Sequence, residues 1–261
     1  MNEAPAPSCI EVRNLTLAHG DRVLLRDLNF TVRHEDIFII MGGSGCGKSS
    51  LMRTIIGLQA PAAGAVRYGE TDFWRCTEGE RQSLLRNIGV LFQGGALWTS
   101  MTLAENIALP LSRYTALCDE EIREQACLKL ALVGLAGFEE YYPFEISGGM
   151  RKRAGLARAL ALDPHILFFD EPSAGLDPVS ARNLDDLILE LRQSLKMTFV
   201  VVTHELASIF AIGSNAVFLN SETRSAEVCG APKDILHSTQ SAQIRRFLTR
   251  GAAGQGDGHA L

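Results

Sequence analysis

The most informative run of residues in this sequence is a glycine-rich loop with the composition of a phosphate-binding site. It follows the pattern G-x-x-x-x-G-K-S, and its residues are Gly42, Gly43, Ser44, Gly45, Cys46, Gly47, Lys48 and Ser49, with Ser50 next in the chain. The glycines allow backbone N–H groups to converge on phosphate oxygens, and a helix that begins near Lys48 would add its positive end. Lys48 is predicted to reach the β- and γ-phosphates, and Ser49 to place its hydroxyl on Mg²⁺. The loop therefore predicts nucleotide binding.

A pair of carboxylates at the end of an apolar run is the second candidate. Residues 166–169 are apolar, and Asp170 and Glu171 follow them directly. Taken alone, such a pair is commonly a solvated feature at the end of a strand. After a phosphate-binding loop, Asp170 is expected to bind Mg²⁺, and Glu171 to hold and polarise the attacking water.

A third segment, Ser147, Gly148 and Gly149, lies where a helix is expected to begin. Serine caps a helix N-terminus, and two glycines expose free backbone donors, so this segment can form a second anion site. Taken alone, the segment is a weak signal, and an ordinary helix cap is the better interpretation of it. The same alternative applies to Asp177, because Asp177 and Pro178 would form an N-cap with proline at the first helical position.

The elements that must position these residues alternate between strands and helices. Residues 37–41 form a continuous apolar run, as expected of a strand that is buried on both faces of a parallel sheet. Similar runs occur at residues 88–92, 166–169, 199–202 and 217–219, and helical periodicity lies between them. This alternation predicts an α/β fold with a mostly parallel core sheet.

Two further regions differ from this pattern. Residues 10–17 and 23–32 are predicted to form an antiparallel hairpin, and the span from residue 101 to about 158 an all-helical subdomain. Residues 1–9 are predicted to be a flexible tail, and residues 236–261 a C-terminal helix followed by a disordered tail.

The composition excludes several classes of protein. The 261 residues carry a formal net charge of -5, so no basic surface indicates nucleic acid. The six cysteines form no C-x-x-C pair, which argues against a zinc ribbon or a disulfide framework. No apolar run approaches the roughly 18–20 residues that span a bilayer, and the N-terminus does not resemble a secretory signal. We therefore expect a cytoplasmic protein.

In their order along the chain, the motifs resemble those of the ATP-binding cassette ATPases. The order is the phosphate-binding loop, Gln93 after a strand, Ser-Gly-Gly at a helix start, the Asp-Glu pair, and His204 after another strand. The resemblance covers residues 10–235. It implies a P-loop NTPase core, RecA-like, with an N-terminal antiparallel β subdomain and an all-helical signature subdomain.

The resemblance also implies a head-to-tail homodimer that binds ATP and Mg²⁺. Ser147, Gly148 and Gly149 would close over the γ-phosphate of the ATP held by the partner. Gln93 would contact Mg²⁺ and water, His204 the γ-phosphate and water, and Asp177 the dimer interface. His19 stands where the family usually places an aromatic residue that stacks on adenine, and Ile146 and Met150 replace the usual leucine and glutamine of the signature.

A finer resemblance is to the Mla-type phospholipid-transport ATPases that serve MCE-protein systems. It rests on four segments: L-F-Q-G-G-A-L-W at residues 91–98, S-G-G-M-R-K-R at residues 147–153, G-L-D-P at residues 175–178, and the ending I-R-R-F-L at residues 244–248. The implied partners are integral membrane permease subunits, an MCE-domain periplasmic protein and a small regulatory subunit, with no nucleic acid. Residues 94–101 would receive the permease, with Leu97 and Trp98 as apolar contacts, although Trp98 is equally consistent with core packing.

The sequence predicts an ATPase of this family, but it leaves the transported substrate open. The first hypothesis is a phospholipid-transport ATPase on the cytoplasmic face of the inner membrane, attached through the permease. The alternatives are an ATPase subunit of an importer of a polar solute, and a soluble cassette regulator that has no permease.

Overall fold

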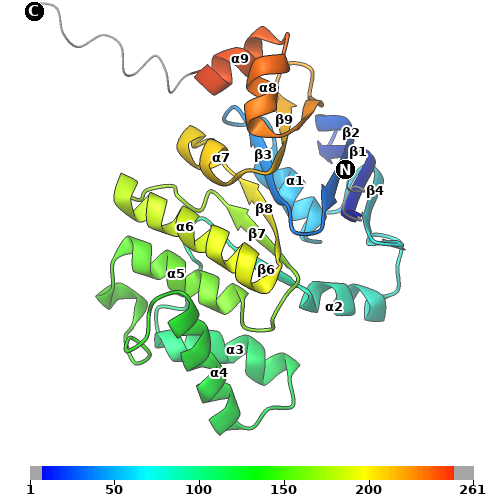
Figure 1. Ribbon diagram of the computed structural model, residues 1–261. Coiled ribbons are helices and arrows are strands. Elements are labelled where there is room, and N and C mark those ends of the chain that lie inside the picture. The colour runs from blue at the N-terminus through cyan, green and yellow to red at the C-terminus, as the bar shows by residue number, and fades with distance from the viewer. Residues whose placement is uncertain (1–7, 250–261) are drawn as a thin grey trace, which may run out of the picture. The chain divides into compact units, whose positions relative to one another are not determined.

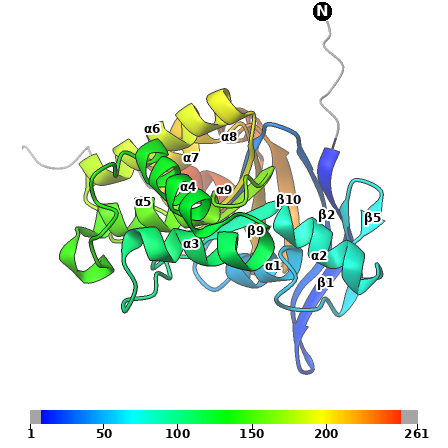
Figure 2. The ribbon, with the colours of Figure 1, turned by 90° about the horizontal axis from the view of Figure 1, so that it is seen from below.

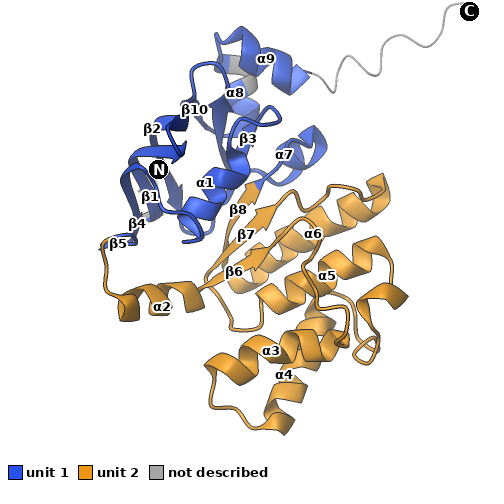
Figure 3. Ribbon diagram, turned by 180° about the vertical axis from the view of Figure 1, so that it is seen from behind, with its two compact units in different colours: residues 1–74, 202–261 blue, residues 75–201 orange. Residues whose placement is uncertain are grey.

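The computed structural model describes residues 8–249, which form two compact units (Figure 3). The first unit contains the chain up to Trp74 and from Val202 onward, and the second contains Arg75–Val201. Of the predicted N-terminal tail, residues 1–7 lie outside the described residues, whereas residues 8 and 9 belong to the first strand. The tail predicted from residue 251 onward also lies outside the described residues.

The first unit contains an antiparallel sheet with the strand order β2-β1-β4-β5. Its strands are β1 (Ser8–His19), β2 (Arg22–Arg33), β4 (Ala63–Tyr68) and β5 (Thr71–Asp72), and β1 and β2 form a long hairpin (Figure 2). Along β1 the buried side chains are at even positions up to Val12 (Ile10 and Val12) and at odd positions from Leu15 (Leu15 and Leu17). The alternation changes because the register with β2 shifts between Val12 and Leu15. The predicted hairpin is confirmed.

The first unit also contains β3 (Ile37–Gly42), β9 (Asn215–Asn220) and β10 (Ser225–Gly230), in the order β10-β9-β3. β3 is parallel to β9, and each of its residues is buried, which explains its unbroken apolar sequence. The helices of this unit are α1 (Lys48–Ile55), α7 (Leu206–Ile212), α8 (Pro232–Ser238) and α9 (Ala242–Thr249).

The second unit contains β6 (Ile88–Leu91), β7 (Ile166–Asp170) and all but the last residue of β8 (Thr198–Val202), in the order β8-β7-β6, with β6 parallel to β7. Its α-helices are α2 (Glu78–Arg86), α3 (Leu103–Tyr114), α4 (Asp119–Leu132), α5 (Gly148–Ala159) and α6 (Pro178–Leu195), and a 3₁₀ helix covers Pro143–Glu145 (Figure 1). The span from residue 101 to 158, predicted as a helical subdomain, lies entirely within this unit.

Local sequence signals set the boundaries of these helices. α3 begins at a capping box, in which the hydroxyl of Thr102 accepts from the N–H of Glu105 and the Glu105 carboxylate accepts from the N–H of Thr102. α6 begins after Asp177, which caps it, with Pro178 at the first helical position.

The predicted α/β class is confirmed, because parallel strands and helices occur in both units. A helix long and apolar enough to cross a membrane does not occur between residues 8 and 249.

Candidate active site

The glycine-rich loop of the first unit connects the buried strand β3 to the N-terminus of α1, as the sequence predicts. Gly42, Gly45 and Gly47 have positive φ angles of 154°, 73° and 99°. A Cβ atom on Gly42 would lie 2.6 Å from the carbonyl oxygen of Leu219 on the neighbouring strand β9. Glycine is therefore required at this position both by backbone conformation and by space.

Lys48 is buried at the start of α1, and its ammonium group lies over the loop. Its Nζ atom donates to the carbonyl oxygens of Gly42 and Gly43, each at 3.0 Å. These contacts place a positive charge beside the backbone that the sequence predicts to surround phosphate. Burial raises the pKa of the neighbouring Cys46 thiol, and the Lys48 charge acts in the opposite direction.

The two predicted histidines of the first unit are both exposed. His19 is the last residue of β1, at the turn of the β1–β2 hairpin. His204 follows Thr203, a fully buried residue whose backbone N–H donates to the carbonyl of Ile40 on β3 at 3.3 Å. This bond fixes the segment that carries His204 beside the strand that leads into the phosphate-binding loop.

In the second unit, the predicted carboxylates stand at the end of β7. Asp170 is the last residue of the strand, and Glu171 is the first residue of the turn that follows. Both are partly buried. Glu171 has a φ of 50°, a left-handed backbone conformation that is uncommon outside glycine. Such strain persists only where the surrounding structure holds it, and it occurs preferentially at functional sites.

Gln93 is exposed on the loop after β6. The loop turns sharply, with the N–H of Gly95 donating to the carbonyl of Phe92 at 2.8 Å. Arg158 on α5 holds it, because its guanidinium donates to the carbonyls of Gly95 at 3.0 Å and Ala96 at 2.7 Å. A Cβ atom on Gly155 would lie 2.9 Å from the carbonyl oxygen of Gly95, so α5 and this loop are in close contact.

The Ser147-Gly148-Gly149 segment opens α5, as predicted. The Ser147 hydroxyl accepts a hydrogen bond from the N–H of Met150 at 3.2 Å, and α5 begins at Gly148. The helix-cap interpretation is thus confirmed, and it leaves the two glycines at the first helical positions, where backbone donors are unused within a helix. A cavity of about 600 Å³ adjoins this segment, and Ser147, Gly149, Met150, Arg153 and Ser180 are among its lining residues.

Asp177 is an N-cap as well. Its carboxylate accepts from the N–H groups of Val179 and Ser180, both at 3.0 Å, and from the Ser180 hydroxyl at 2.5 Å. The hydrogen bond from the Ser180 side chain is the main cause that lowers the pKa of Asp177 below its usual value. The side chain is exposed, so capping does not prevent it from contacting a partner.

Trp98 does not pack in the core, since 58% of its surface is exposed. Its backbone is held by Asn106, a fully buried residue of α3. The Asn106 side-chain amide accepts a hydrogen bond from the Trp98 N–H and donates one to the Trp98 carbonyl. The core-packing alternative for Trp98 is therefore wrong, and the indole is available on the predicted permease surface at residues 94–101.

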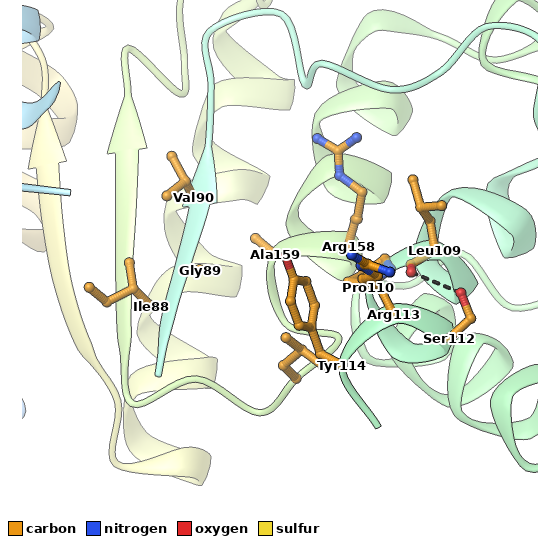
Figure 4. Close-up of a pocket in the computed structure, with 11 residues that line it drawn as sticks. Ile88, Gly89, Val90, Leu109, Pro110, Ser112, Arg113, Tyr114, Arg158 and Ala159 are labelled. Carbon is orange, nitrogen blue, oxygen red and sulfur yellow. Dashed lines mark hydrogen bonds between the residues drawn. The ribbon is translucent and has the colours of Figure 1, made fainter. Parts of the chain in front are cut away.

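A separate pocket of about 580 Å³ lies between β6, the second half of α3 and the end of α5 (Figure 4). Leu109, Pro110 and Tyr114 contribute apolar surface, and Arg113 and Arg158 contribute positive charge. Arg158 also holds Gly95 and Ala96, so one side chain joins the pocket to the loop of Gln93.

The two units divide the predicted site residues between them. The phosphate-binding loop, His19 and His204 belong to the first unit, whereas Gln93, Ser147–Gly149, Asp170, Glu171 and Asp177 belong to the second. Sequence reasoning missed Asn106, Lys152 and Arg158, which hold functional loops through backbone carbonyls. Only the basic run at residues 151–153 pointed to any of them, and a basic run on a helix usually indicates a solvated face.

Comparison with known proteins agrees with this geometry. Residues 25–174 match the ABC transporter family. The "Probable ribonucleotide transport ATP-binding protein mkl" of Mycobacterium bovis is 40% identical over 244 residues, which cover 94% of this chain and 67% of that protein. The "Intermembrane phospholipid transport system ATP-binding protein MlaF" of Haemophilus influenzae is 38% identical over 249 residues, which cover 95% of this chain and 92% of that protein.

A solved structure gives a further comparison. An ATP-binding cassette in a dimeric, post-hydrolysis state, bound to ADP and Pi, superimposes with a TM-score of 0.76 at 29% identity. The match covers 85% of this chain and 98% of that one. The phosphate-binding loop and the Asp-Glu pair thus lie in a chain whose fold is that of an ATP-binding cassette.

Proposed function

Because the chain belongs to the ABC transporter family, we propose that it is the ATP-hydrolysing subunit of a transporter that moves phospholipid. The observation that carries the nucleotide part of this proposal is the geometry of the phosphate-binding loop. Three glycines with positive φ occur from the end of a fully buried strand to a helix N-terminus, and the Lys48 ammonium donates to the carbonyls of Gly42 and Gly43.

ATP would be bound mainly through its phosphates. The backbone from Gly42 to Gly47 supplies N–H donors, Lys48 neutralises the β- and γ-phosphates, and Ser49 and Ser50 supply hydroxyls at the start of α1. His19 would stack on adenine, and the imidazole offers a smaller surface than the usual aromatic side chain.

The residues proposed for Mg²⁺ fit that ion by the chemistry of their donor atoms. Ser49, Gln93 and Asp170 offer a hydroxyl, an amide oxygen and a carboxylate, which are the hard oxygen ligands that Mg²⁺ takes alongside phosphate oxygens. When bound, the ion would neutralise negative charge that develops on the phosphates.

Hydrolysis transfers the γ-phosphoryl group to water, and the protein's main task is positioning and charge neutralisation. We assign Glu171 as the group that orients the water and accepts its proton. His204 would donate a hydrogen bond to the γ-phosphate and contact the water, and Gln93 would orient the water from its exposed position on the loop after β6.

A head-to-tail homodimer would complete the site. The dimeric form of the solved relative supports this arrangement. Ser147, Gly148 and Gly149 would direct the N-terminus of α5 at the partner's γ-phosphate, where the helix dipole favours negative charge. Asp177, exposed at the start of α6, would contact the partner.

We propose that an integral membrane permease binds the surface around Trp98 and the pocket of Figure 4. Both features are accessible and partly apolar, and Arg158 connects the pocket to the Gln93 loop. This attachment would hold the chain at the cytoplasmic face of the inner membrane, with an MCE-domain protein and a small regulatory subunit as further partners. No role for nucleic acid is proposed, because the net charge is -5.

The names of the relatives point to two different cargoes, phospholipid for MlaF and ribonucleotide for mkl. We favour phospholipid because the match to MlaF extends over 92% of that protein, against 67% for mkl. Ribonucleotide transport corresponds to the alternative of a polar-solute importer and remains the competing hypothesis.

Purification of the tagged chain from its native membranes in a mild detergent distinguishes these functions. Mass spectrometry would identify co-purifying proteins and bound lipid. An integral permease, an MCE-domain protein and phospholipid are the expected result. A permease with a periplasmic solute-binding protein would contradict the phospholipid cargo, and absence of any permease would favour a soluble regulator. The matched control is Trp98→Ala, which should lose the permease without unfolding.

A further inference from the structure

A buried lysine on α5 makes contacts that the proposed mechanism does not yet use. Lys152 is only 7% exposed, and its Nζ atom donates to the carbonyl oxygens of Glu171 at 3.4 Å and Ala174 at 2.7 Å. It also donates to the carbonyl of Pro172. These residues form the turn that carries Glu171, and they lie with α5 in the second unit.

The chemistry of the contact is specific to an ammonium group. A lysine ammonium has three N–H donors and no acceptor, and here each of the contacted residues offers a carbonyl oxygen. Burial lowers the pKa of Lys152, whereas the nearby charge of Glu171 raises it. The carbonyls take the place of water around the cation, which explains how it can be buried.

The turn that carries Glu171 has a strained backbone, so contacts with the rest of the unit are needed to stabilise it. Glu171 has a φ of 50°, which is unfavourable for a residue with a side chain. Within the turn, the N–H of Ala174 donates to the carbonyl of Glu171 at 3.2 Å, and Lys152 bonds to the same oxygen. Lys152 therefore fixes the backbone from which the Glu171 carboxylate extends.

The other basic side chains of α5 hold different segments. Arg151 donates to the carbonyl of Ile146 at 2.8 Å, Arg153 to that of Val133 at 3.2 Å, and Arg158 to that of Ala96 at 2.7 Å. In contrast to these three, Lys152 reaches the Glu171 turn. It thus connects the helix that begins at the Ser147 cap with the turn that carries the proposed catalytic carboxylate.

We propose that Lys152 is a positioning residue for ATP hydrolysis, which holds the Glu171 turn against α5 so that the Glu171 carboxylate is aimed at the attacking water. This inference rests on the proposed function. In the head-to-tail dimer, the same helix touches the partner's nucleotide through Ser147–Gly149. Lys152 would then link contact with one ATP to the geometry of the carboxylate that acts on the other.

The test compares Lys152→Met and Lys152→Gln with the wild type, using steady-state ATP hydrolysis by the purified 261-residue chain. Lys152→Met removes every donor, and Lys152→Gln keeps two on a shorter, neutral group. We expect kcat to fall roughly ten- to hundredfold in Lys152→Met, because small errors of position have such effects. KM should change less than twofold, since the phosphate-binding loop is untouched, and Lys152→Gln should be intermediate.

Lys129→Met is the matched control. Lys129 is another buried lysine of the second unit, and its Nζ atom bonds to Asp163 at 2.5 Å, away from the Glu171 turn. It should lose stability and retain kcat. Wild-type kcat in Lys152→Met, or an equal fall in Lys129→Met, would overturn the proposal. If Lys152→Met does not fold, Lys152→Gln is judged by the same criterion.

A double variant identifies the route by which Lys152 acts. In single-turnover hydrolysis, Lys152→Met combined with Glu171→Gln should be within twofold of Glu171→Gln alone, because the carboxylate that Lys152 positions is already gone. A further tenfold fall would mean that Lys152 acts through another group, which would overturn the proposal. A wild-type chain that hydrolyses no ATP would instead contradict the proposed function itself.

Discussion

Asn106 and Trp98 are joined by two hydrogen bonds: the N–H of Trp98 donates to Oδ1 of Asn106 at 2.7 Å, and Nδ2 donates back to the Trp98 carbonyl at 3.0 Å. The amide is fully buried, whereas the indole is mostly exposed. The backbone of Trp98 therefore belongs to the structure of the second unit, and its side chain is left available for a partner.

Trp98→Ala should weaken permease binding without destabilising the chain. An exposed side chain contributes within about 0.5 kcal/mol to stability, whereas a tryptophan at the centre of an interface contributes about 2 kcal/mol or more to binding. Co-purification with the permease and chemical denaturation of the isolated chain measure the two effects. Asn106→Ala serves as the contrast, since it should lower the free energy of unfolding by at least about 2 kcal/mol. Equal destabilisation by both variants would disprove this division of roles.

Glu171→Gln should trap ATP and stabilise the dimer. The amide keeps the size of the side chain and cannot accept a proton from water, so kcat should fall at least about a hundredfold. Size-exclusion chromatography with and without ATP should show an ATP-dependent dimer. Unchanged steady-state hydrolysis would show that Glu171 is not the base.

Gly42→Ala should destabilise the chain more than Gly45→Ala. Both positions have positive φ, but of the two only Gly42 has atoms within 4 Å of an added Cβ, among them the carbonyl oxygen of Leu219 at 2.6 Å and the sulfur of Cys46 at 2.7 Å. We expect Gly45→Ala to lower the free energy of unfolding by about 1 kcal/mol, from backbone conformation alone, and Gly42→Ala to lower it by at least about twice that amount. Thermal unfolding in the absence of nucleotide measures both, and equal costs would contradict the predicted contact.

Asp177→Asn should make the free energy of unfolding less dependent on pH in the acidic range. Hydrogen bonds from Ser180 and Val179 lower the pKa of Asp177 in the folded chain. A carboxylate whose pKa is lowered by folding stabilises the fold at pH values above its unfolded pKa, near 3.9, and this contribution is lost as pH falls through the folded pKa. Urea denaturation should show that the wild type is more stable than Asp177→Asn at neutral pH and that the two free energies of unfolding become similar in acid. A difference that is independent of pH would exclude a role for the charge.

The core strands could be predicted because a strand buried on both faces has a continuous apolar sequence. β3, β7 and β8 are of this kind, and the sequence located each to within about a residue. α2 was not predicted, because none of its residues is buried and it has no apolar periodicity. Its capping box at Thr77 and Glu80 was the available signal.

The candidate site was only partly accessible to sequence reasoning. Motifs located the residues expected to touch nucleotide, since their chemistry depends on residue type and local spacing. The residues that hold the loops could not be located in this way, because Lys152 bonds to carbonyls about twenty positions along the chain and Arg158 to carbonyls more than sixty positions away. Any residue type supplies a carbonyl, so such a bond leaves no trace in the sequence of the acceptor.

If this chain uses ATP to move phospholipid, as we propose, the transporter that contains it should transfer lipid only when ATP is present. The complex isolated with the tagged chain would be reconstituted into vesicles that contain a labelled phospholipid, and transfer of the label would be followed with and without ATP. In parallel, the same vesicles would be tested for uptake of a labelled ribonucleotide. We expect phospholipid transfer that requires ATP and is lost in Glu171→Gln, with no ribonucleotide uptake. ATP-dependent ribonucleotide uptake without movement of phospholipid would contradict it.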